Sequence, residues 1–235
     1  FQPLNGILSE FKTEVRLMYD NTAIYVGLMM YDNEPSKINV QLSSRDEINN
    51  VDFIGIYIDP FNDAQNAYGF FVTASGVQVD MKASLNGEED ESWDAVWYSE
   101  VNVTDQGWCA ELKIPFSALR FPDQPAQTWG VNFLRQIYRL KKKDSWNFID
   151  RKGDNFLNQA GTVTGIENIK PPVRLAIIPY LAGYAENQSV EIDPSYSFKG
   201  GMDVKLGLSE SFTLDMMVIP DFGQVIEPSF QWRVC

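Results

Sequence analysis

Aromatic residues of the kind that stack against sugar rings gather in two stretches of the chain. Three of the six tryptophans fall within residues 93–108, WDAVWYSEVNVTDQGW, and Trp146 is followed closely by Phe148. The apolar face of an aromatic ring suits the CH face of a pyranose, and neighbouring polar groups can bond its hydroxyls. The same side chains are equally suited to fill a hydrophobic core. Their positions on the predicted strands help to decide between the two roles.

Strand alternation predicts that two of the first three tryptophans belong to the core. In WCAELKI, Trp108 shares one face with Leu112, and the charged residues occupy the other face. In WYSEVNV, Trp97 shares a face with Val101 in the same way. Trp93 precedes its strand, so alternation leaves its role open.

Trp146, with Phe148, is the first candidate for sugar stacking, and Trp93 is the second. The polar neighbours of Trp146 that can supply directional hydrogen bonds are Asn147, Arg151 and Asn155. The alternative is that Trp146 is a strand residue packed beneath the loop 150–160.

Oxygen-rich side chains follow the apolar stretch DFIGIYID. Asp59, Asn62 and Asp63 can offer oxygen ligands to calcium, although their spacing does not match an EF-hand loop. The alternative is that these side chains cap the turn at the strand end. No cofactor is expected apart from this possible calcium ion.

Composition excludes several classes of function. The 235 residues carry a net charge of −13, which argues against binding nucleic acid. There is no histidine, so Ser-His-Asp triads and His-ligated zinc or haem are excluded. The two cysteines, Cys109 and Cys235, form no recognisable disulfide framework. No pair of carboxylates stands out as the acid and base of a glycosidase, so no catalytic residue is predicted.

Period-two alternation between turn residues predicts an all-β protein with about nine strands before residue 170. This pattern is typical of an antiparallel two-sheet β-sandwich, jelly-roll-like in type. The predicted strands span residues 13–19, 23–31, 52–59, 68–74, 77–83, 97–103, 108–114, 129–140 and 144–148.

A second region is predicted after Lys170-Pro171-Pro172, because consecutive prolines interrupt regular structure. Residues 174–186 and 199–222 predict amphipathic strands of about ten residues, typical of a transmembrane β-barrel. Such a barrel needs at least about eight strands, so the region would be only its beginning. The predicted domains are residues 1–169, the sandwich, and 172–235, the start of a barrel.

The order of several motifs resembles a known family. The pattern GW-x-x-E-x-x-IPF-x-x-LRF at 107–121 and PDFGQV at 220–225 are the most specific of them. The chain resembles the family 9 carbohydrate-binding-module-like domain that precedes an uncharacterised β-barrel domain in bacterial outer-membrane proteins. The resemblance implies a glycan or oligosaccharide as partner. It also implies export to the outer membrane or periplasm of a Gram-negative bacterium, with membrane attachment through the C-terminal region.

The resemblance also implies where a sugar clamp would lie. One clamp tryptophan aligns with residues 48–50, where this chain has Ile-Asn-Asn, and a glutamate aligns with Gly55. The second clamp aromatic aligns with Trp146. Only half of the clamp is therefore present.

Three hypotheses follow for function. The first is a non-catalytic glycan-binding domain linked to polysaccharide binding and catabolism. The second is a structural plug or periplasmic accessory domain of a barrel, in which Trp146 is buried. The third is part of a glycoside hydrolase whose catalytic groups lie outside this chain.

Overall fold

The computed structural model describes residues 6–46, 48, 50–150, 152–153, 155–172, 175–186, 195–207 and 213–218. The chain divides into two compact units, Phe1–Pro172 and Val173–Cys235. The described residues form strands and short 3-10 helices, and no α-helix occurs among them.

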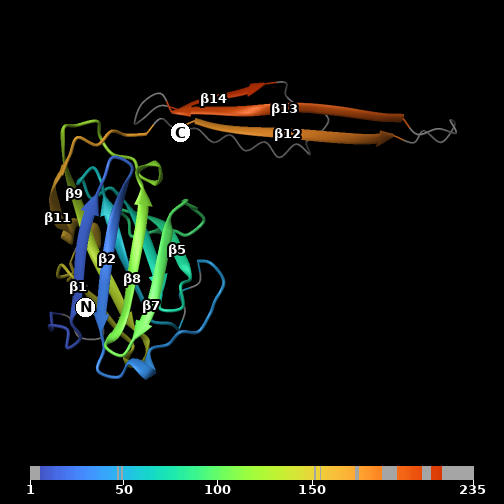
Figure 1. Ribbon diagram of the computed structural model, residues 1–235. Coiled ribbons are helices and arrows are strands. Elements are labelled where there is room, and N and C mark those ends of the chain that lie inside the picture. Colours follow the sequence, from blue (N-terminus) through green and yellow to red (C-terminus); the bar gives the residue numbers. More distant parts are fainter. Residues whose placement is uncertain are drawn as a thin grey trace. The chain divides into compact units, whose positions relative to one another are not determined.

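The first unit is a sandwich of two antiparallel sheets, as the alternation predicted. The smaller sheet has the order β1-β2-β8-β7, and Figure 1 shows these four strands side by side in one layer. Its strands are β1 (Thr13–Tyr19), β2 (Ala23–Tyr31), β7 (Tyr98–Thr104) and β8 (Gly107–Pro115). The larger sheet has the order β10-β9-β3-β4-β5-β6, and β11 also pairs with β9. Its strands are β3 (Phe53–Asp59), β4 (Asn66–Thr73), β5 (Gln78–Ser84), β6 (Glu89–Asp90), β9 (Ala126–Ile137), β10 (Lys142–Ser145) and β11 (Gly161–Glu167).

The hairpins form where short polar turns separate alternating runs. Between β1 and β2, the Asp20 carboxylate accepts hydrogen bonds from the backbone N–H groups of Thr22 and Ala23, at 2.7 and 2.9 Å. Such capping closes the turn and sets the register, which pairs Tyr19 with Ile24.

The larger sheet is covered by apolar side chains on both faces. The main core fills the space between the two sheets and includes Ile56 of β3, Trp108 of β8 and Trp129 of β9. A second buried cluster lies on the other face of the larger sheet and includes Phe53, Tyr57, Phe71, Val79, Met81 and Leu157. As a result, every residue of β3 is buried.

Several strands differ from the sequence-based expectation, among them the short β6, which was not predicted, and β9, which spans Ala126–Ile137 and not 129–140. β10 spans Lys142–Ser145 rather than 144–148, because a 3-10 turn (η3, Tyr138–Leu140) ends with Lys141 in the left-handed conformation and pairing with β9 begins at once. β11 was not predicted at all. Its pairing with β9 is interrupted between Val163 and Ile166, so it lacks regular alternation.

The second unit contains a three-stranded antiparallel sheet, β12 (Leu175–Glu186), β13 (Ser195–Gly207) and β14 (Thr213–Val218). Its strand register places on one face the exposed apolar residues Leu175, Ile177, Leu181, Phe198, Met202, Leu214 and Met216. The opposite face is mixed, with a Lys205–Asp215 ion pair at 3.9 Å. The described part of the chain contains no helix with the length and hydropathy that crossing a membrane requires.

Candidate functional site

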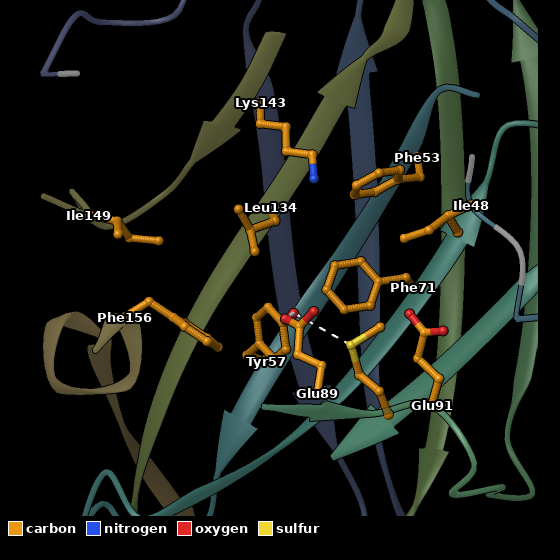
Figure 2. Close-up of a pocket in the computed structure, with 11 residues that line it drawn as sticks. Ile48, Phe53, Tyr57, Phe71, Glu89, Glu91, Leu134, Lys143, Ile149 and Phe156 are labelled. Atoms are coloured by element: carbon orange, nitrogen blue, oxygen red, sulfur yellow. Dashed lines mark hydrogen bonds between the residues drawn. The ribbon is translucent and has the colours of Figure 1, made fainter. Parts of the chain in front are cut away.

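An aromatic pocket lies on the outer face of the larger sheet, away from the smaller sheet. Its volume is about 190 Å³. Tyr57 of β3 and Phe71 of β4 lie at its centre, with Lys143 toward one end and Glu89 and Glu91 toward the other (Figure 2). The remaining lining residues are Ile48, Phe53, Met81, Leu134, Ile149 and Phe156.

Gly55 leaves room for the rings of Phe53, Tyr57 and Phe71, which together form the aromatic floor of the pocket. Gly55 lies between Phe53 and Tyr57 on the same face of β3, and a Cβ atom there would lie 2.1 Å from Cδ1 of Phe71. The Phe71 ring therefore rests directly on the β3 backbone. It makes edge-to-face contacts with Phe53 and Tyr57, with ring centroids 5.7 and 5.0 Å apart.

The wall beside Tyr57 comes from a distant part of the chain. The ring of Phe156, in the 3-10 helix η4 (Phe156–Gln159), lies 4.8 Å from that of Tyr57 between centroids. Asn155 holds this turn in place, because its side chain accepts the N–H of Leu157 and donates to the carbonyl of Ser84. The predicted sugar contact Asn155 is thus engaged in shaping the pocket wall.

Only some of the polar side chains in the pocket make hydrogen bonds within the protein. The Tyr57 hydroxyl donates to Glu89 at 2.5 Å, and burial, together with the negative charge of Glu89, raises the pKa of Tyr57 well above its usual value. Tyr57 therefore stays a neutral donor at physiological pH. Lys143 Nζ lies 5.6 Å from the ring centroid of Phe53. Neither the Glu91 side chain nor the Lys143 side chain has a hydrogen bond or ion pair within the described residues.

Two of the three aligned clamp positions fall at this pocket, and the third, Trp146, does not line it. Ile48, within the segment aligned with the first clamp tryptophan, lines it, and Gly55, aligned with the glutamate, lies beneath Phe71. The space that a side chain at position 55 would need is therefore filled by a phenyl ring. At position 55, where the resemblance places a glutamate, this pocket therefore has an apolar ring instead.

Trp146 and Phe148 are exposed, by 57% and 55%. The Trp146 ring lies over Gly161 and meets Phe133 edge to face at 6.0 Å, so it packs at the edge of β9. Phe148 lies close to Gly6. Both rings keep a face open to solvent, and their sugar-binding role stays a prediction.

The other predicted sugar contacts do not join Trp146 in one site. The Asn147 amide donates to the backbone carbonyl of Gln159 at 2.5 Å, which holds the loop. Trp93 is half-buried against the rings of Tyr68 and Phe70, so it contributes mainly to the core. Arg151 lies outside the described residues. Trp97 and Trp108 are core residues, as predicted, with 4% and 1% of their surface exposed.

The predicted calcium ligands cap a turn. Asp59 is buried, and its carboxylate accepts the backbone N–H groups of Phe61, Asn62 and Ala64 at 2.8–3.1 Å. Burial raises the pKa of Asp59. Asp63 accepts the N–H of Gln65 at 2.9 Å. No group of three or more Asp, Glu, His or Cys side chains is arranged to hold a metal ion in the described ranges, and calcium binding stays a prediction.

Sequence reasoning missed the residues that build the pocket, namely Tyr57, Phe71, Glu89, Glu91 and Lys143. One signal was available in FIGIYID, where Phe53 and Tyr57 occupy the face opposite the three isoleucines. A strand that is apolar on both faces is covered on both, and the outer cover marks the pocket.

A second concavity lies over the outer face of the smaller sheet, with a volume of about 320 Å³. Its lining includes Glu100, Glu111 and Lys113. Lys113 Nζ lies 5.8 Å from the ring centroids of both Tyr25 and Tyr98. None of the aligned clamp positions belongs to this surface.

Comparison with known proteins finds solved structures that are similar to this chain. Among solved structures, a candidate carbohydrate-binding protein from Bacteroides uniformis has a TM-score of 0.54 at 14% identity, covering 66% of this chain and 79% of its own. A carbohydrate binding module of family 9 from Caldicellulosiruptor kristjanssonii, in complex with glucose, has a TM-score of 0.43 at 18% identity, covering 71% and 84%. No curated protein sequence matches significantly.

Two family models match the chain. Residues 171–229 match a domain of unknown function, DUF5916. Residues 4–162, well over half of the chain, match the model described as carbohydrate family 9 binding domain-like. The chain therefore belongs to the carbohydrate family 9 binding domain-like family.

Proposed function

We propose that this chain is a non-catalytic carbohydrate-binding domain that holds one sugar ring of a glycan in the Tyr57–Phe71 pocket. One observation carries the proposal. In a member of this family, positions 48 and 55, which align with two parts of the clamp, fall together at an aromatic pocket.

The chemistry of the pocket suits a sugar. The half-buried ring of Phe156 offers an apolar surface for the CH groups of a pyranose, above a floor made by the buried rings of Tyr57 and Phe71. Glu89, Glu91 and Lys143 offer acceptors and donors for hydroxyl groups. The volume of about 190 Å³ lies below the ~300–1,000 Å³ of drug-sized sites, so it suits a single ring with the rest of the glycan outside.

The test is calorimetric titration of the full chain with a panel of oligosaccharides, in calcium and in EDTA. Phe156→Ala should weaken binding by about fivefold to tenfold, the value of one aromatic contact. Phe61→Ala is the matched control, because this exposed ring does not line the pocket, and it should leave the affinity unchanged.

Other outcomes would indicate a different sugar site or a different function for the chain. Loss of binding in a third variant, Trp146→Ala, alone would move the sugar site to the edge of β9. Failure to bind any glycan would contradict the proposal and favour the structural accessory role. That role expected a buried Trp146, whereas the ring is 57% exposed.

The proposal extends to location. We propose that the chain is exported and attaches to the outer membrane through its second unit, where glycan capture serves polysaccharide breakdown. The support is the apolar face of β12, β13 and β14, since outer-membrane strands present such a face to lipid.

A further inference from the structure

The positive and negative side chains of the pocket lie at opposite ends. Figure 2 shows Lys143 at one end of the aromatic floor and Glu89 and Glu91 at the opposite end. Glu89 of β6 and Glu91, in the turn that follows this strand, form the acidic end. Asp90, between them, does not line the pocket and accepts hydrogen bonds from Ser92 instead.

The acidic end can only accept hydrogen bonds from a ligand. The side-chain polar atoms at this end are the two carboxylates and the Tyr57 hydroxyl, and that hydroxyl already donates to Glu89. An ionised carboxylate has no proton to give. A ligand group placed here must therefore be a donor, and two adjacent negative charges favour a donor that is positively charged.

The aromatic rings of the pocket add to this preference. A cation that meets the face of the half-buried Phe156 ring is attracted by the ring quadrupole, and more strongly where water is partly excluded. Phe71 lies where a side chain at position 55 would otherwise stand, so this position adds no polar group to the floor. At the far end, Lys143 repels a cation and can donate to a hydroxyl, which fixes the orientation of the ring.

We infer that the pocket selects a sugar bearing a protonated amino group, with the amine held between Glu89 and Glu91 and the hydroxyls toward Lys143. The inference rests on the proposed function and specifies its ligand class as amino sugars with a free amine.

Three trisaccharides of equal length test it, built from glucosamine, N-acetylglucosamine or glucose. The titrations use the full chain at about pH 6, where the amine of glucosamine is protonated. The glucosamine trisaccharide should bind at least about tenfold more tightly than either neutral one, the value of a charge-assisted hydrogen bond.

Variants of Glu89 and Glu91 test whether these residues cause the preference for the glucosamine trisaccharide. The double variant Glu89→Gln/Glu91→Gln should abolish it, and the single variant Glu91→Gln should reduce it without touching the Tyr57–Glu89 hydrogen bond. The matched control is Glu100→Gln/Glu111→Gln, which removes the same charge from the outer face of the smaller sheet and should keep the preference.

Each remaining outcome has one meaning. If all three trisaccharides bind equally and Phe156→Ala weakens them all, the proposed function stands and the amine preference is wrong. If the preference survives Glu89→Gln/Glu91→Gln or disappears in the control, it comes from the overall negative charge and the inference is again wrong. If none of the trisaccharides binds and no glycan of the wider panel does, both proposals fail.

Discussion

Gly55 shapes the pocket by lacking a side chain. The Phe71 ring occupies the space above it, and any Cβ atom at this position would overlap that ring. Gly55→Ala should therefore destabilise the fold by about 1–3 kcal/mol, the usual cost of overpacking a filled site. It should also weaken glycan binding, because the Phe71 ring must move.

Urea unfolding followed by circular dichroism measures the stability change. Gly27→Ala is the matched control, since Gly27 also lies in a strand but a Cβ atom added there would lie 4.0 Å from its nearest neighbour, the carbonyl oxygen of Arg16. Its stability should change by less than about 0.5 kcal/mol. Equal stability of the two variants would show that Phe71 does not need the space above Gly55.

For single residues, the sequence predicts burial well where the neighbours that determine it lie along the same strand. Trp108 was placed correctly in the core because alternation along β8 determines its face, and Trp97, directly before β7, was also placed correctly. The pocket was not predictable in this way. Its walls come from Ile48, Ile149 and Phe156, which lie outside strands and reach Tyr57 only through the tertiary fold.

At the scale of elements, one buried carboxylate ties the two sheets together. Asp80 of β5 is fully buried and accepts hydrogen bonds from the Trp97 indole N–H at 3.2 Å and the backbone N–H of Ala95. It also pairs with Arg45. Because residues 95–97 lead directly into β7, Asp80 fixes the crossing from the larger sheet to the smaller one.

Asp80→Asn should destabilise the first unit by about 3 kcal/mol, because a carboxamide cannot accept from all three donors and Arg45 loses its buried ion-pair partner. The fluorescence of Trp97 should change with it. Asp94→Asn is the control, since Asp94 also approaches Arg45, at 3.5 Å, but its side chain is 76% exposed. A similar small effect of both variants, measured by urea unfolding, would contradict the proposed tie.

The sequence predicted which segments form strands better than it predicted which side of the sheet each side chain faces. The β1–β2, β4–β5 and β7–β8 hairpins were predicted because their turns are short and local. In β5, however, the polar residues Asp80 and Lys82 face the inter-sheet side, while Val79 and Met81 face outward. Alternation alone cannot distinguish these orientations when both faces of a sheet are covered.

At the scale of the whole molecule, the two units bury their apolar residues differently. The first unit encloses its core between two sheets, whereas the three strands of the second leave large apolar residues exposed along one face. Soluble proteins rarely expose such continuous apolar surface. The second unit should therefore carry any affinity of the chain for lipid.

Flotation with phosphatidylcholine and phosphatidylethanolamine vesicles tests this expectation. The full chain should float with the vesicles even at high salt, because burial of apolar surface is not screened, and residues 1–172 alone should remain behind. Ile177 and Ile178 provide a matched pair, since they are similarly exposed but point to opposite faces of β12. Ile177→Asp should reduce flotation and Ile178→Asp should have a smaller effect. Equal flotation of the full chain and of residues 1–172 would assign any lipid affinity to the sandwich and contradict attachment through the second unit.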